Sequence, residues 1–418
     1  MVQETEKEHE DILEQADETD AMFGELYSWY LRNTEYRSRV QKLVQSAFAG
    51  KPEDIISQSV AKALYGEVSP YSATRLERFA ACAFAHFLQY GMKLTERVEY
   101  EFKPMDMGNV MHEALESFAE EVRKRGMKWT ELTEQERNEI ADRCLDNIVA
   151  DYGNTVLKSS ARNEYMIERT RRILRRTVWA LQKQLEQGEF QPEGFEVTFG
   201  GGRIDRVDIM EDQNKVYVKV IDYKTGNTSF DLVYLYHGLQ LQLMIYLDGA
   251  LRVEQKKYPD KEIIPAGVFY YNIKDPMIQE KIDADVEAVS AGLMKELKMN
   301  GLVQADPELV YRMDSSLGSI PVAFNKDGSF RKNSSVADRT QFAVLGRYVR
   351  TKIEKIRSSI LEGDAEVSPY ELGKKNACTY CPYMTVCGFD RRLSGYEFRR
   401  LKNFSDEELW KAFDREAE

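Results

Sequence analysis

Long apolar runs are absent from this sequence of 418 residues. No stretch reaches the roughly eighteen consecutive apolar residues that a membrane-spanning helix requires. The first twenty residues are acidic and polar, without the basic and apolar regions of a secretory signal peptide. The chain also has no Gly-x-x-x-x-Gly-Lys-Ser/Thr phosphate loop, no internal repeat and no low-complexity linker. These absences predict a globular, cytoplasmic protein.

Cysteine is scarce, and the 58 lysines and arginines are outnumbered by 70 aspartates and glutamates. Five cysteines in a reducing cytosol do not favour a disulfide framework, but three of them fall within ten residues, which favours a metal site. The net charge is −12, whereas proteins that bind nucleic acid are often basic overall. Any DNA binding would therefore have to come from local basic patches.

The apolar pattern changes its period along the chain. Helical spacing predicts helices at residues 72–88, 105–125, 130–188, 231–252, 281–300 and 338–362. Alternation predicts strands within residues 195–224 and at 268–271. The glycine-containing segment between residues 300 and 338 is typical of a loop.

Two carboxylates and a lysine stand out in the alternating segment. With Gln213 and Asn214 as a two-residue loop, Asp205 lies opposite Asp222 in a hairpin, on the face that also carries five valines and isoleucines. Lys224, two residues after Asp222, points the same way. Paired carboxylates repel unless a cation such as Mg²⁺ or Mn²⁺ lies between them. The alternative is a plain hairpin with charged ends, which is far more common than a catalytic one.

Two helices carry further candidates. Gly108 and His112 are four residues apart and share a helix face, as do Gln242 and Tyr246 on the helix after the hairpin. A glycine would let its helix approach another element closely. Taken singly, a helical histidine is usually structural, and Gln242 and Tyr246 fit the edge of an amphipathic helix.

Together these segments resemble the RecB-like family of PD-(D/E)xK nucleases, in particular the nuclease domain of AddB-type helicase–nuclease subunits. The matching segments are residues 108–112, 202–208, 222–224 and 242–246, which occur in the family's order. Residues 76–82 and the C-terminal cysteines also match, so the resemblance runs from about residue 68 to the end.

The resemblance implies a role for each matching residue. Asp205 and Asp222 would bind the metal, His112 would be a further ligand and Lys224 the catalytic lysine. Gln242 and Tyr246 would belong to the catalytic motif that follows them. Glu196 matches an acidic position of the first strand less closely.

The C-terminal cysteines form a compact motif. Cys378, Cys381 and Cys387 supply three thiolates, and Cys82 can be the fourth ligand. The resemblance implies a [4Fe–4S] cluster, while spacing alone leaves a structural Zn²⁺ site open. Cys144 has no partner at such spacing and is interpreted as a packing residue.

The expected fold is α/β, with a restriction-endonuclease-like core of a small mixed sheet flanked by helices and helical extensions at both ends. Residues 1–67 are expected to form the N-terminal extension. Residues 68–418 would form the nuclease domain, with its core at about 105–275. One departure from the family is the short connection at residues 200–202. Full-length members carry a helicase-like portion before this region, so the chain is expected to be a C-terminal piece.

The implied function is Mg²⁺-dependent exonucleolytic hydrolysis of single-stranded DNA in double-strand-break repair, with an AddA-like helicase–nuclease subunit as partner in a heterodimer. One rival is a catalytically silent DNA-binding or scaffold subunit, which the intact acidic and lysine positions disfavour. Another is a different cluster-bearing RecB-like nuclease, such as the CRISPR adaptation exonucleases, whose chains are much shorter.

Overall fold

The computed structural model describes residues 20–47, 55–66, 72–96, 104–151, 160–200, 202–278, 285–393 and 395–417. The chain divides into two compact units. The smaller comprises residues 1–54 and 388–397, and its described part contains a helical segment at 20–32 and α2 (Arg37–Ala47). The larger, residues 55–387 and 398–418, contains every residue that the sequence singled out for chemistry.

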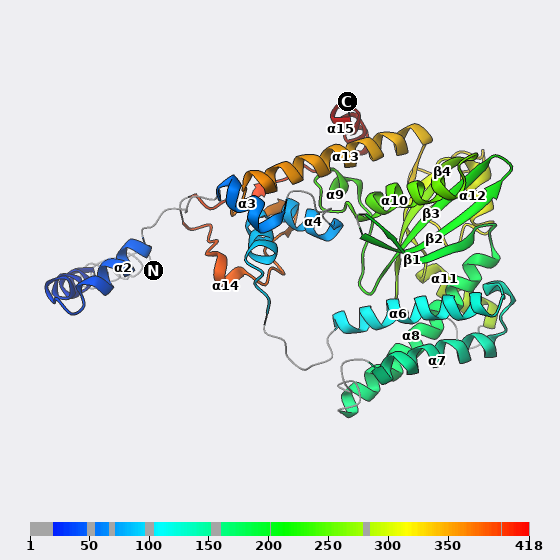
Figure 1. The fold of residues 1–418 in the computed structure, drawn as a ribbon, viewed down its shortest axis with the longest axis horizontal. Coiled ribbons are helices and arrows are strands. Elements are labelled where there is room, and N and C mark those ends of the chain that lie inside the picture. The colour runs from blue at the N-terminus through cyan, green and yellow to red at the C-terminus, as the bar shows by residue number, and fades with distance from the viewer. Residues whose placement is uncertain are drawn as a thin grey trace, which may run out of the picture. The chain divides into compact units, whose positions relative to one another are not determined.

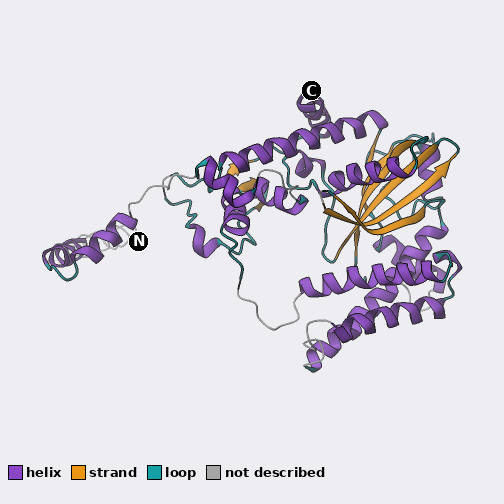
Figure 2. Ribbon diagram, in the orientation of Figure 1, coloured by secondary structure: helices purple, strands orange, loops and turns teal. Residues whose placement is uncertain are grey.

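A six-stranded mixed sheet forms the centre of the larger unit (Figure 2). Its strands, in spatial order, are β1 (Gln191–Phe199), β2 (Gly202–Asp212), β3 (Lys215–Lys224), β4 (Glu262–Asn272), β5 (Asn300–Gln304) and β6 (Val336–Ala337). Strands β1 to β3 pair antiparallel, β3 pairs parallel with β4, β4 antiparallel with β5, and β5 parallel with β6. This is the small mixed sheet that the sequence predicted.

Helices cover both faces of the sheet (Figure 1). On one face α6 (Pro104–Lys124), α7 (Glu134–Asp151) and α8 (Ala161–Glu186) form one apolar core with side chains of β2 to β5. On the other, α10 (Gln242–Lys257), α13 (Arg339–Glu362) and α15 (Asp406–Ala417) form a second core with the sheet. The sheet is therefore the middle layer of a three-layer α/β structure, as expected.

Shorter elements complete the larger unit. The helices are α3 (Gln58–Tyr65), α4 (Ala73–Ala81), α5 (Ala83–His86), a π-helical turn (Phe87–Gly91), a 3₁₀ turn (Trp129–Glu131), α9 (Leu232–Tyr236), α11 (Val286–Glu296), α12 (Pro307–Met313) and α14 (Met384–Cys387). A second sheet joins β7 (Tyr370–Leu372) to β8 (Lys375–Asn376) and β9 (Arg399–Arg400). In the described part of the chain, no helix is both long and apolar enough to cross a membrane.

The hairpin prediction is confirmed in register and facing. Asp212 pairs with Lys215, which leaves Gln213 and Asn214 as the loop, and Arg206 pairs with Ile221. Val207, Ile209, Val216, Val218 and Val220 all lie in the core on the α10 side. Strict alternation determines this outcome, because a slip of one residue would turn these side chains to the opposite face.

The prediction of a loop between residues 300 and 338 is wrong, because this segment contains β5, α12 and β6. The second residue of β5 is Gly301, where a Cβ atom would lie 1.9 Å from the carbonyl oxygen of Val268 on β4. Glycine weakens the strand signal in the sequence, yet here it permits the close pairing of two backbones. Pairing with β4 thus outweighs local propensity.

Candidate active site at the end of the sheet

The β2–β3 hairpin places Asp205 and Asp222 at the same end of the sheet. Their strands pair in register up to Arg206 and Ile221, so the two aspartates are the next residues along. Both are buried. Asp205 Oδ2 accepts a hydrogen bond from the backbone N–H of Tyr223 at 2.7 Å, which fixes this carboxylate across the two strands.

His112 and Glu196 approach Asp205 from two other elements. His112 Nδ1, on α6, lies 3.3 Å from Asp205 Oδ2 and 3.9 Å from Glu196 Oε1, on β1. One ligand atom from each of the three residues lies within 4.8 Å of the others. Glu196 has a φ of +49°, a conformation that non-glycine residues rarely adopt and that persists where the surrounding structure imposes it.

The electrostatics of this group fit a divalent cation. Burial and the charge of Asp205 raise the pKa of Asp222 to about 7, and the same two causes raise that of Glu196 to about 7. Burial alone would lower the pKa of His112, but its hydrogen bond to Asp205 and the nearby carboxylates raise it. Carboxylate oxygens are ligands that Mg²⁺ and Mn²⁺ prefer, and a cation among them would remove the mutual repulsion of the carboxylates.

A chain of polar contacts runs from Asp222 to α10. Lys224 Nζ lies 2.6 Å from Asp222 Oδ2 and donates to Gln242 Oε1 at 2.7 Å. Gln242 in turn donates to the Tyr246 hydroxyl at 2.9 Å, and burial raises the pKa of that hydroxyl to about 12. The four side chains therefore form one network, with Lys224 held between a carboxylate and an amide.

Glu77, on α4, also supports this network, and sequence reasoning did not single it out. Its Oε1 accepts the backbone N–H groups of Leu241 at 2.7 Å and Gln242 at 2.9 Å. These groups lie at the N-terminus of α10, where Leu241 has no side-chain capping hydrogen bond. Glu77 is therefore a capping residue supplied by another helix. Local sequence carried no signal for it, since 164 residues separate it from Leu241.

The prediction that Gly108 allows a close approach is confirmed. A Cβ atom on Gly108 would lie 3.3 Å from Oγ1 of Thr225, the residue after Lys224. The absence of a side chain therefore lets the His112 face of α6 lie directly against the end of β3.

The four cysteines predicted to share a site come together in the structure. Cys82 and Cys381 pack in one small apolar cluster with Tyr383, whose hydroxyl donates to the carbonyl of Leu94 at 3.0 Å. Burial and the nearby Cys82, Cys381 and Cys387 raise the pKa of Cys378 to about 12. All are free thiols. No three of these sulfurs, which all belong to the described residues, lie within 4.8 Å of one another.

Cys144 lies in the core formed by α6, α7 and α8, apart from the four-cysteine cluster. This position agrees with its interpretation as a packing residue.

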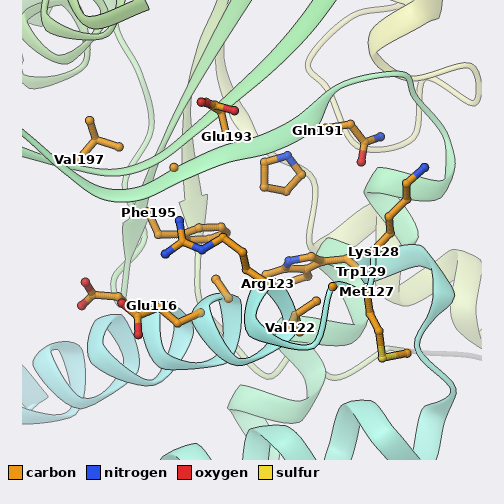
Figure 3. A pocket seen from close by; sticks show the side chains of 15 residues that line it. Glu116, Val122, Arg123, Met127, Lys128, Trp129, Gln191, Glu193, Phe195 and Val197 are labelled. Carbon is orange, nitrogen blue, oxygen red and sulfur yellow. The ribbon is translucent and has the colours of Figure 1, made fainter. Parts of the chain in front are cut away.

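A cavity of about 480 Å³ lies between α6 and β1 (Figure 3). Its lining includes the stacked rings of Trp129 and Phe195, whose centroids are 5.8 Å apart. The cations of its lining are Arg123 and Lys128, and the acids are Glu116, Glu120 and Glu193. Acidic side chains outnumber basic ones, so the charge of this cavity does not suit a polyanion.

Comparisons with known proteins agree with these features. The model of the PD-(D/E)XK nuclease superfamily matches residues 70–388. A protein of Lachnoclostridium phytofermentans, named as one subunit of an ATP-dependent helicase/deoxyribonuclease, is 41% identical over 421 residues, which cover 95% of this chain and 36% of that protein. Proteins of the same name from Thermoanaerobacter sp. (strain X514) and Clostridium acetobutylicum are 34% and 33% identical over 96% of this chain. The chain spans little more than a third of the length of these curated relatives.

Proposed function

The chain belongs to the PD-(D/E)XK nuclease superfamily, and from this premise we propose that it hydrolyses phosphodiester bonds of DNA. The observation that carries the proposal is the convergence of His112, Glu196 and Asp205 beside the Asp222–Lys224 pair, at one end of the sheet. Two further elements, α6 and β1, supply groups in addition to the hairpin itself. A plain hairpin with charged ends would not recruit a histidine and a third carboxylate.

We propose a specific task for each side chain. His112, Glu196 and Asp205 would hold Mg²⁺ or Mn²⁺, and Asp222 would be a further carboxylate beside the ion. The ion supplies Lewis-acid stabilisation of the negative charge that develops on the phosphate. Lys224 contributes a second positive charge and orients the attacking water, and Gln242 keeps its ammonium group directed into the site.

The test is cleavage of single-stranded and duplex DNA by the purified protein, with Mg²⁺ or with a chelator. Asp222→Ala should reduce cleavage by at least about a hundredfold, because it removes one carboxylate of the pair and the partner of Lys224. Asp260→Ala, at an exposed carboxylate, is the matched control. Wild-type cleavage by a folded Asp222→Ala protein would contradict the assignment. Metal-dependent DNA binding without cleavage by the wild type would instead favour a silent DNA-binding subunit.

We further propose that the nuclease acts on single-stranded DNA within a helicase–nuclease complex that processes double-strand breaks, beside an AddA-like subunit. The support is the name that the relatives carry, which describes them as one subunit of a helicase/deoxyribonuclease. Co-purification with such a partner, and loss of DNA degradation by the complex when Asp222 is replaced, would test this proposal.

For Cys82, Cys378, Cys381 and Cys387 we propose a [4Fe–4S] cluster with a structural role. Four thiols that approach one another without forming disulfides suit such a ligand set. The alternative for the same four thiolates is a single structural Zn²⁺ ion. Elemental analysis of an oxygen-free preparation distinguishes the two. Stoichiometric zinc without iron would reject the iron–sulfur assignment.

A further inference from the structure

A second cavity, of about 470 Å³, lies between α10 and α13, which occupy the same face of the sheet (Figure 1). We call it the α10–α13 groove. Its apolar lining includes the partly exposed side chains of Phe199, Val253 and Ile353, together with the buried Leu76, Met244 and Val349. Residues 198–200, at the end of β1, line it as well.

The charged side chains of the groove are mostly basic. Arg252 and Lys256 come from α10, and Arg350 and Arg357 from α13. The only acidic residue in the lining, among the described residues, is Asp248, although Arg357 also pairs with Glu354 on α13 at 3.2 Å. In a chain with a net charge of −12, this local excess of positive charge is a specific feature of the groove.

The arginines on the two walls are held towards each other. Asp248 Oδ2 pairs with Arg252 Nη2 at 2.8 Å, and Asp248 Oδ1 accepts a hydrogen bond from Arg350 Nη1 at 2.8 Å. Both arginines remain more than half exposed. Asp248 therefore orients two guanidinium groups across the groove and leaves donors of each available to a ligand.

The groove borders the polar network of the candidate active site. Phe199 lines the groove and its ring contacts that of Tyr246 edge-to-face at 5.9 Å. Tyr246 belongs to the network that holds Lys224. Gly249, about one helical turn after Tyr246, leaves room for the Phe199 ring, because a Cβ there would lie 2.6 Å from it. Phe199 and Tyr246 thus form an aromatic edge between the groove and Lys224.

We propose that the α10–α13 groove binds single-stranded DNA and guides it to Lys224 and the acidic residues. Its arginines and lysine would contact successive phosphates, and the partly exposed Phe199, Val253 and Ile353 would pack against unpaired bases. A duplex would not use the apolar lining in this way, because its bases are stacked and paired inside. This inference rests on the proposed nuclease function and adds the path of the substrate.

Binding in the presence of a chelator tests the groove independently of cleavage. Fluorescence anisotropy of a labelled single strand, measured over a range of salt concentrations, gives the number of phosphates contacted. Each phosphate contact to a single strand contributes about −0.7 to the slope of log K against log salt, so removing a contact makes the slope less negative by that amount. Arg252→Gln combined with Lys256→Gln should therefore flatten the slope by about 1.4 and weaken binding roughly tenfold. Arg123→Gln combined with Lys128→Gln, in the cavity between α6 and β1, is the matched control and should change neither quantity.

Cleavage provides a second readout. With Mg²⁺, the Arg252→Gln, Lys256→Gln protein should show a raised KM for a single-stranded oligonucleotide. Its rate on bis(p-nitrophenyl) phosphate, which is too small to reach the groove from the acids, should stay at the wild-type value. An unchanged salt slope would overturn the groove proposal, and equal weakening of duplex binding would overturn its preference for single strands. If the wild type binds DNA through the groove but cleaves neither substrate, the nuclease proposal fails and the groove proposal stands.

Discussion

Removal of the Glu77 carboxylate should impair catalysis although Glu77 does not belong to the metal-binding group. Glu77→Ala leaves the N–H groups of Leu241 and Gln242 at the start of α10 without their acceptor. Loss of a capping acceptor costs about 0.5–2 kcal/mol and an unsatisfied buried N–H about 1–3 kcal/mol, so the free energy of unfolding should fall by about 2 kcal/mol at about pH 5, where the raised pKa keeps Glu77 protonated. The first turn of α10 carries Gln242, which holds Lys224.

Loss of the cap should displace the first turn of α10 and, with it, Gln242 and the ammonium group of Lys224. The kinetic effect follows from this displacement. A shift of about 1 Å in a catalytic group can cost about a hundredfold in rate, so kcat on single-stranded DNA should fall roughly 10–100-fold with little change in KM. Glu77→Gln keeps an oxygen that can accept both N–H groups and should recover most of the activity. Thr74→Ala, at an exposed position of the same helix, is the control. Wild-type kcat in Glu77→Ala, or equal damage in Glu77→Gln and Glu77→Ala, would refute this account.

The same carboxylate should leave a signature in the pH dependence of stability. Burial raises the pKa of Glu77 from 4.5 to about 7, against the lowering effect of its two backbone hydrogen bonds and of Lys224, while Asp222 raises it further. The folded state therefore favours the protonated form, and stability is lost as pH rises from about 4.5 to 7. Relative to wild type, Glu77→Gln should gain up to about 3 kcal/mol between about pH 5 and pH 8, since each pKa unit corresponds to about 1.36 kcal/mol. Groups common to both proteins cancel in this difference, and a difference independent of pH would contradict the burial of the charge.

Three further predictions concern other parts of the larger unit. Lys224→Ala should reduce cleavage by about a hundredfold without lowering Tm, because the lysine is partly exposed and serves the reaction rather than the core; an unaltered rate would exclude it from the site. Cys82→Ala should lower Tm and DNA binding together, since metal binding by Cys82 and the C-terminal cysteines closes a long loop that contains the active site. Cys144→Ala should do little, and a Cys82→Ala protein that keeps its metal and its Tm would reject the structural role. Gly108→Val should separate α6 from Thr225 and weaken Mn²⁺ binding, measured by calorimetry, by roughly tenfold; unchanged affinity would show that α6 need not approach so closely.

Glu77 also links the two predicted sites. It lies on α4, and the C-cap of this helix is Cys82, the most distant member of the cysteine set in sequence. One part of this helix thus contacts the start of α10, and its end supplies a proposed cluster ligand. If Cys82→Ala lowers kcat in the same way as Glu77→Ala, α4 is the connection between the cluster and the active site. If Cys82→Ala lowers only Tm, the cluster stabilises the fold without positioning Lys224.

The sequence by itself determined those features that depend on neighbours in the chain. Alternating valines and a two-residue loop specify the register of β2 and β3, and with it the adjacency of Asp205 and Asp222. Spacing of four residues places Gln242 and Tyr246 on one helix face, where they hydrogen-bond as neighbours. Local geometry is sufficient for these conclusions because each involves a single strand pair or a single helix.

Only the tertiary structure decided which distant residues meet. Glu196 lies beside His112 and Asp205 and has a positive φ on β1. The alternating pattern of a strand does not predict this backbone conformation. Glu77 caps a helix 164 residues away, and Gly301 enters a strand because the backbone of β4 passes so closely. The α10–α13 groove likewise combines cations from two helices that are distant in sequence. Such contacts depend on how whole elements pack, and the packing is determined by the two apolar cores on either side of the sheet rather than by any local segment.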